Sequence, residues 1–193
     1  YTSSLKPIST IAPHSSGLID SSVKPETGKS WEIGAKYEMP GGLTGSLALF
    51  DIRKKNVLVS QFNSVTGLTE WRTSGAARSR GMELDVAGEI DSRWSTIGSL
   101  AVLDAKTTRD PEYAGNRLWN VARVTASAGA VYNVGELLGS DQLRVGARAR
   151  YSGRRPGDSA NSFWLPSFTV ADLFATYDTA IMDRKVRFQF NVK

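Results

Sequence analysis

Apolar and polar residues alternate along several segments of the chain, most clearly in its last third. From Gln142 to Ser152 every second residue is apolar, beginning at Leu143 and ending at Tyr151, and three arginines stand among the residues between them. From Lys185 to Val192, Val, Phe, Phe and Val alternate with Lys, Arg, Gln and Asn. Because successive side chains of a strand point to opposite faces, both segments are predicted to be strands with one apolar and one polar face.

The same alternation recurs less strictly in earlier segments and predicts an all-β, antiparallel fold. It is visible from Trp31 to Tyr37 and from Gly81 to Ala87. Further strands are expected over these ranges: Leu43 to Arg53, Trp94 to Leu103, Val121 to Tyr132 and Ser167 to Tyr177. The total is about eight strands, close to the length of ~9 to 11 residues that a tilted membrane strand needs.

The connections between these strands alternate in length. The shorter links are residues 39–42, 88–93, 133–141 and 178–184, and the longer ones are residues 54–75, 104–120 and 153–166. Short turns on one rim and long loops on the other are typical of an outer-membrane barrel. Four aromatic residues beside the shorter links fit an interfacial girdle, although aromatic residues also favour strands in general; they are Tyr37, Trp94, Tyr132 and Tyr177.

Composition removes many other classes of function. No uninterrupted apolar stretch approaches the ~18 residues of a membrane helix. The chain has no Cys and one His, His14 in a Pro- and Ser-rich stretch, so we expect no catalytic centre, no resident metal and no cofactor. Its 24 basic and 19 acidic residues are interspersed along the chain, which argues against nucleic acid as a partner.

Alternation alone leaves the orientation of the sheet open. A soluble barrel packs apolar residues inside, whereas a membrane barrel turns them toward lipid. Arg144, Arg148 and Arg150 on one polar face, and small residues such as Ala126 and Ala128 on the apolar one, favour a wet interior. A soluble all-β ligand-binding domain remains the alternative.

Two of the longer links hold residues that suit an anionic ligand. Guanidinium groups bind carboxylate or catecholate oxygens in a forked geometry, and aromatic rings can line a ligand path. The alternative is that these arginines pair with acids across the rim and that the aromatic residues pack the loops. The candidate ligand-binding residues are Tyr113, Arg117, Trp119, Arg154, Arg155 and Trp164.

One pair of carboxylates also invites an enzymatic interpretation. Glu83 and Asp85 share a strand face, as a general acid and base would. Because Arg78 and Arg80 stand just before them, we expect the four residues to form ion pairs in a polar lumen instead. No residue is therefore assigned a catalytic role, and the chain is not expected to be an enzyme.

A series of short motifs resembles the TonB-dependent siderophore receptors of the outer membrane. The strand-opening signature "LKPE…G…S…E.G.K" of that family is similar to residues 23–37 of this chain, which read Val-Lys-Pro-Glu at their start. The other matching pieces follow in the family's order: Leu47 to Ile52, Lys55 to Val57, Gly75 to Asp85, Gly115 to Leu118, Gly153 to Asp158 and Phe188 to Val192. The pieces are most similar to the ferrichrome and ferripyoverdine branch.

The resemblance implies a plugged barrel of the 22-stranded class that imports a ferric siderophore with energy from TonB. Residues 1–193 would be the C-terminal part of that barrel, with the plug domain, the TonB-contact segment and the final strand outside the chain. A passive outer-membrane pore or adhesin barrel is the alternative function. One departure is local: after Asn120 and Val121, relatives often carry Pro and then His, where Ala122 and Val124 stand here, which weakens inference about the ligand from that loop.

Overall fold

A computed structural model describes residues 2–6, 24–65, 67–137, 139 and 141–193, so His14 lies outside the described residues. Within these ranges the chain forms strands only, and no helix is long and apolar enough to cross a membrane. The strands are β1 (Thr2–Lys6), β2 (Glu26–Glu38), β3 (Thr44–Asn63), β4 (Leu68–Glu89), β5 (Trp94–Arg109), β6 (Val124–Gly135), β7 (Gln142–Ser152), β8 (Arg155–Pro156), β9 (Trp164–Leu165), β10 (Phe168–Ile181) and β11 (Arg184–Val192).

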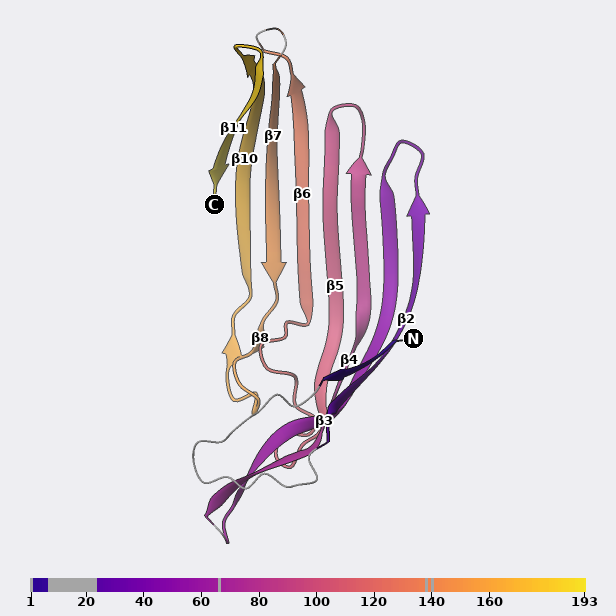
Figure 1. The fold of residues 1–193 in the computed structure, drawn as a ribbon, viewed down its shortest axis with the longest axis vertical. Helices are drawn as coiled ribbons and strands as arrows, with labels where there is room; N and C mark the ends of the chain where they lie inside the picture. Colours follow the sequence, from indigo (N-terminus) through magenta and orange to yellow (C-terminus); the bar gives the residue numbers. More distant parts are fainter. Residues whose placement is uncertain (1, 7–23, 66, 138, 140) are drawn as a thin grey trace.

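Nine of the described strands form one antiparallel sheet in the order β1-β2-β3-β4-β5-β6-β7-β10-β11 (Figure 1). Strands β8 and β9 form a separate two-stranded ribbon. The expected all-β, antiparallel fold is confirmed. The expected count of about eight strands falls one short of the sheet because β1, which pairs with the start of β2, follows no clear alternation in the sequence.

The pairing register sorts the side chains of this sheet into two continuous faces. Directly paired residues of antiparallel strands project to the same side, so the register can be followed from strand to strand. One line of pairs runs Ile33, Leu49, Met82, Val102 and Val124. We call this side the apolar face. Its other members include Leu47, Leu84, Leu100, Leu143, Val145, Leu173, Phe188 and Phe190.

The opposite side is the polar face. It carries charged and hydroxyl groups on nearly every strand: Glu32, Lys36, Ser46, Glu83, Asp85, Ser99, Ser127, Arg144, Arg148, Arg150, Asp172, Asp178 and Arg187. No second layer covers either face among the described residues, where the buried nonpolar side chains are Ala105, Ala122 and Pro156. Trp31, Ile33 and Phe190 are 71%, 74% and 67% exposed. Within the described residues, these strands therefore do not seal their apolar side chains in a core.

The shorter links lie together at one end of the sheet, at the top of Figure 1, and the longer ones lie at the other. The predicted sorting of the links is confirmed except for residues 54–75, most of which are paired strand. At the short-link rim, Trp94 and Tyr132 pair across β5 and β6 with ring centroids 4.8 Å apart, and the Arg93 guanidinium donates to the Tyr132 hydroxyl at 3.2 Å. The Tyr177 hydroxyl donates to the buried carboxylate of Asp141. Both tyrosines thus have an apolar ring on the apolar face and a hydrogen-bonded tip.

Two expectations about these strands were wrong. Residues 54–75 were expected to form a loop, but β3 and β4 continue as a paired ribbon as far as Asn63 and Leu68. Arg78 and Arg80 were expected to pair with Glu83 and Asp85. Each arginine is an odd number of positions away from each acid along β4, so their side chains project to opposite sides of the sheet. The two arginines lie on the side of the apolar face, and the two acids lie on the polar face.

Gly81 marks a place where two strand backbones come close. A Cβ added at Gly81 would lie 2.9 Å from the Cα of Leu103 and closer still to the Val102 carbonyl oxygen, so it would push β5 away from β4. A Cβ added at Gly98 would meet only the Ser127 carbonyl oxygen, at 3.6 Å.

We predict that Gly81→Ala destabilises the folded full-length protein by about 1 to 3 kcal/mol through overpacking. The matched Gly98→Ala change should have little effect. The measurement is thermal unfolding in detergent, followed by the loss of β-sheet circular dichroism. Equal stability of the two variants would mean that the close approach at Gly81 is relieved at no cost.

Candidate functional site

The links β5–β6 and β7–β10 meet at the long-link rim and are tied together by asparagine side chains. Asn161 accepts a hydrogen bond from the backbone N–H of Arg117 at 3.0 Å and donates to the Arg117 carbonyl oxygen, also at 3.0 Å. Asn116 donates to the carbonyl oxygens of Ser159 and Ala160, each at 3.0 Å. The two links therefore form one surface.

The β8–β9 ribbon fixes the second of these links. The Gly157 N–H donates to the Phe163 carbonyl oxygen at 3.0 Å, and the Phe163 ring lies over Gly157 so closely that any added Cβ would overlap it. Asn120 connects this ribbon to the other link: its N–H donates to the Pro156 carbonyl oxygen at 3.0 Å, and its side chain accepts from Arg155 Nε at 2.7 Å. Asn120 and Asn161 both adopt positive φ, at 59° and 57°, which Asn tolerates better than most residues.

Three of the predicted ligand-binding residues come together on this surface. The guanidinium carbon of Arg154 lies 4.8 Å from the ring centroid of Trp164, and that of Arg117 lies 5.9 Å from it. Both are within the range of cation–π contacts. We call Arg117, Arg154 and Trp164 the rim cluster. Arg155 lies beside it and packs over Phe168 at 5.4 Å.

Several donors of these arginines have no partner among the described residues. Nε and Nη2 of Arg117 and Nη1 of Arg155 are buried and make no hydrogen bond. Buried polar atoms in proteins are nearly always hydrogen-bonded, whereas each of these guanidinium nitrogens lacks an acceptor oxygen. These nitrogens are covered by the protein itself, so it is the positive charge and the indole of the rim cluster that suit a ligand rich in anionic or carbonyl oxygens.

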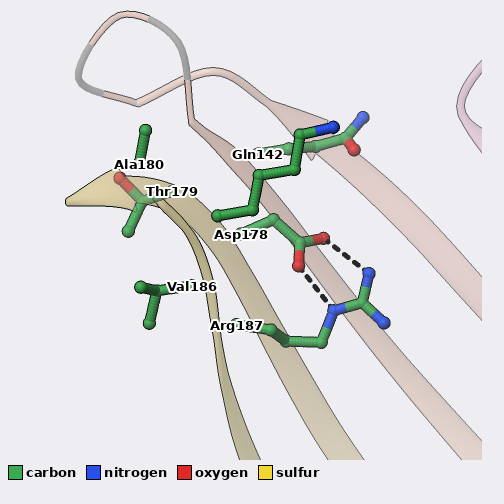
Figure 2. A pocket seen from close by; sticks show the side chains of 7 residues that line it. Gln142, Asp178, Thr179, Ala180, Val186 and Arg187 are labelled. Atoms are coloured by element: carbon green, nitrogen blue, oxygen red, sulfur yellow. Dashed lines mark hydrogen bonds and ion pairs between the residues drawn. The ribbon is translucent and has the colours of Figure 1, made fainter. Parts of the chain in front are cut away.

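Part of the polar face is also basic. On β7, β10 and β11, four arginines share two carboxylates: Asp172 contacts Arg148 and Arg150, both at 3.5 Å, and Asp178 contacts Arg144 at 3.2 Å. Arg187 is the second partner of Asp178, at 2.5 Å (Figure 2). Figure 2 also shows Thr179 and Val186 on the other side of the β10–β11 hairpin, as the register requires.

Comparison with known protein families decides what kind of barrel this sheet belongs to. The family described as "TonB dependent receptor-like, beta-barrel" matches residues 2–193. The chain belongs to this family. The recognition of a TonB-dependent receptor barrel in the sequence is thereby confirmed, and the family consists of outer-membrane receptors.

Individual members of the TonB-dependent receptor family show similarity over most of the chain. The metal-pseudopaline receptor CntO of Pseudomonas aeruginosa is 40% identical over 161 residues, which are 81% of this chain and 22% of the receptor. The ferrichrome outer membrane transporter/phage receptor of Escherichia coli is 33% identical over 189 residues, 93% of this chain and 23% of the transporter. The chain thus spans less than a quarter of the length of these two relatives.

A solved structure of the same family has the same arrangement of strands. The siderophore receptor PiuA from Acinetobacter baumannii aligns with a TM-score of 0.67 and 31% identity, over 79% of this chain and 22% of PiuA. In an outer-membrane barrel of this family the apolar face must meet lipid, because only that face can enter hydrocarbon. The polar face with its shared carboxylates then lines the interior.

The other predicted site residues of this TonB-dependent receptor barrel lie in the same two links but make fewer contacts. Tyr113 is half-buried, and its pKa is raised by the neighbouring Glu112 carboxylate, with a smaller contribution from Asp158 across the gap between the links. Trp119 is 62% exposed. Among the described residues, it makes no hydrogen bond or ring contact with the rim cluster or with Arg155. Asn116, Asp158 and Asn161 were not singled out from the sequence. Asparagine and aspartate in a Gly-, Ser- and Pro-rich link are the signal that could have found them.

Asn161 offers a test of whether the two links are held as one unit. Asn161→Gly keeps a residue that accepts positive φ but removes both hydrogen bonds to the Arg117 backbone. We predict that the Arg117 amide exchanges with deuterium about fivefold faster, since a hydrogen bond contributes about 1 kcal/mol net. Ser159→Gly, in the same turn, removes a hydroxyl that makes no such bond and should leave this amide unchanged. The measurement is hydrogen exchange by mass spectrometry on the full-length protein.

Asp158 provides a pH-dependent test of the same turn. The Ser162 hydroxyl donates to its carboxylate, as does the Ser162 N–H at 2.8 Å, and these bonds lower the pKa of Asp158 below 3.8. A carboxyl group whose pKa is lower in the folded than in the unfolded protein stabilises the fold at pH values above its unfolded pKa. This stabilisation is lost as the pH falls through its folded pKa. We predict that protection of the Ser162 amide from exchange is constant at neutral and mildly acidic pH and falls only below pH 3.8. In Ser162→Ala, the fall should begin at higher pH; an unchanged profile would rule out the hydroxyl as the cause.

Proposed function

We propose that this chain contributes the ligand-contacting rim and part of the interior wall of a receptor that binds a ferric siderophore and imports it with energy from TonB. The observation that carries the proposal is the rim cluster. Arg117 and Arg154 lie against one indole, at the end of the sheet that bears the long links.

The chemistry of this cluster fits a metal chelate better than a plain ion. Siderophores present catecholate, hydroxamate or carboxylate oxygens around a metal, with apolar or aromatic surface beside them. A guanidinium donates in a forked geometry to such oxygens, and an indole packs against the flat parts of the ligand. No bond is made or broken in this function, so we propose that the chain has no catalytic role.

The names of the relatives support the class of cargo but differ in its identity. One is a metal-pseudopaline receptor, another a ferrichrome transporter, and a third a siderophore receptor. Their shared cargo is a metal held by an organic chelator. A ferric chelate that carries negative charge is the form best matched to this chain, because the rim cluster holds two arginines and the interior wall over β7, β10 and β11 presents four arginines that share two carboxylates.

We propose, further, that residues 1–193 form the C-terminal part of the family's plugged barrel. The described sheet ends in two strands, β1 and β11, that each pair on one side only. In hydrocarbon, unpaired backbone groups cost several kcal/mol each, so both edges must be closed by further strands. A plug and a segment that contacts TonB would lie in that remainder of the receptor.

The test begins with iron-limited growth of cells that carry the full-length receptor, on a panel of ferric hydroxamates, catecholates and carboxylates and on metal–pseudopaline. The chelate that restores growth is then titrated against purified receptor by quenching of tryptophan fluorescence. We predict that Arg117→Gln and Arg154→Gln each raise its Kd by about 10-fold or more, since hydrogen bonds to charged groups contribute about 1.5 to 3 kcal/mol.

Arg109→Gln is the matched control, because Arg109 ends β5 at the same rim and lies outside the cluster. It should leave the Kd unchanged. Import of radioactive iron from the same chelate should stop when TonB is deleted. Import that continues without TonB would favour a passive pore, and equal weakening by the control would mean that rim charge in general, and not this cluster, attracts the ligand.

A further inference from the structure

Charge is distributed unevenly over the polar face. Its paired residues over β2 to β4 include six carboxylates and two lysines: Glu26, Glu32, Lys36, Glu38, Lys54, Glu83, Asp85 and Glu89. Over β7, β10 and β11 they include five cations and two carboxylates: Arg144, Arg148, Arg150, Asp172, Asp178, Lys185 and Arg187. The residues of β5 and β6 on this face lie between the two sectors and are uncharged from Ser95 to Ala105 and from Thr125 to Asn133. An anion that moves along the interior wall is therefore repelled by the first sector and attracted by the second.

Strand β7 leads from the rim cluster into the basic sector. It ends at Ser152, two residues before Arg154, and Arg148 and Arg150 project from it to the interior. These two arginines share the carboxylate of Asp172, so the three side chains together keep one net positive charge. Arg148 lies four residues, or about 13 Å of strand, from the end of β7. Positive charge thus continues inward from the rim along a single strand.

A hollow of about 300 Å³ opens on the interior wall beside Arg148. Its floor is Gly129, which pairs with Ile97 on β5 and with Arg148 on β7, strands that lie on either side of β6 in Figure 1. A Cβ added at Gly129 would lie 3.5 Å from Ile97 Cγ2 and 3.5 Å from Arg148 Cγ. The missing side chain therefore leaves a space that is bounded by an aliphatic group on one side and by a guanidinium stem on the other.

The next row of paired residues completes the hollow with apolar and aromatic surface. Val131 pairs with Gly146, and Gly146 pairs with Phe174 on β10. The Phe174 ring lies over Gly146 so closely that an added Cβ would overlap it. Ile97 is 61% exposed, and no described residue covers the hollow. A guanidinium beside apolar and aromatic groups is the same combination that the rim cluster presents with Arg154 and Trp164.

The guanidinium of Arg148 has donors to spare. Its Nη2 lies 3.5 Å from Asp172 Oδ2, which is longer than an ordinary N–H···O hydrogen bond. It makes no other hydrogen bond with the residues that the structure describes, and its side chain is 50% exposed. An anionic oxygen in the hollow can therefore accept from Arg148 without breaking an established bond.

We propose that this hollow, with Arg148 at its edge, is a second binding site for the anionic ferric chelate on its way from the rim cluster to the short-link rim. The site rests on the proposed function, because it assigns the interior wall a step in the import of the same cargo. Arg148 donates to the oxygens of the chelate, and Ile97 and Phe174 pack against an apolar or aromatic arm of the chelator. Continuity with the rim cluster along β7 and the charge of the basic sector carry the assignment. The volume is at the lower end of ligand pockets, so the hollow holds one arm and not the whole chelate.

The test separates binding from import in cells that carry the full-length receptor, with the chelate that restores growth. The Kd is measured by quenching of tryptophan fluorescence, and the maximal rate of radioactive iron import is divided by the number of receptors that bind the chelate. We expect Arg148→Gln to leave the Kd unchanged, because the hollow is filled only after the chelate leaves the rim. It should lower the maximal rate about tenfold, the factor that one hydrogen bond to a charged group contributes.

Three further variants show whether the charge and the hollow act together. Arg148→Lys keeps the charge and should retain most of the import rate. Ile97→Asp places a carboxylate in the hollow and should slow import about as much as Arg148→Gln does. Lys36→Gln is the matched control, because it removes one positive charge from the same face in the acidic sector, from a side chain that is 65% exposed. It should import at the wild-type rate.

An unchanged import rate in Arg148→Gln, or equal slowing by Lys36→Gln, would overturn the proposal. A rise in Kd as large as that of Arg154→Gln would place Arg148 in the rim site and would overturn it too. Increased uptake of vancomycin through Arg148→Gln would mean that the hollow anchors the plug instead of the cargo. If the wild-type receptor imports no chelate, the proposed function itself fails, whereas an active wild type with an equally active Arg148→Gln variant refutes only the site in the wall.

Discussion

The structure depends on one constraint: in hydrocarbon, every backbone N–H and C=O must be paired within the protein. A sheet meets this demand through its ladders, and the side chains then fall to two sides with a period of two. That period lets one set of strands present lipid-compatible residues such as Leu49 and Phe190 on one side and arginines such as Arg148 on the other. The division into a wall and an interior follows from the ladder alone.

Charge on both sides of this wall is handled in the same way. Asp51 and Asp104 outside, and Asp172 and Asp178 inside, are each shared between two cations. Sharing holds each carboxylate in place while leaving excess positive charge on the surface. It keeps guanidinium groups ordered without neutralising them, which on the interior wall suits an anionic cargo.

Much of the fold could be predicted from the sequence because its strongest signals are local. The alternation in residues 142–152 and the rim position of Tyr132 and Tyr177 need no knowledge of distant contacts. The extent of β3 and β4 was missed because, outside the membrane, both sides of a ribbon face water and the alternation disappears. The error at Arg78 and Glu83 was avoidable, since residues an odd number of positions apart in a strand point to opposite sides.

The rim site was less predictable, because its organisation depends on side chains of one link meeting the backbone of another. Arg117, Arg154 and Trp164 could be named from their chemistry, but Asn116 and Asn161 acquire their roles only in three dimensions. No pattern of spacing relates residues more than forty positions apart.

The asparagine hydrogen bonds between the two links hold the rim together independently of the side chains that the rim exposes. Asn116 and Asn161 bind main-chain atoms, which every residue possesses, so they hold the links regardless of which side chains point outward. An exposed neighbour such as Trp119 can therefore be exchanged without loosening the scaffold. Such an arrangement allows a lineage of these barrels to change its cargo by a few substitutions while the surrounding architecture is inherited intact.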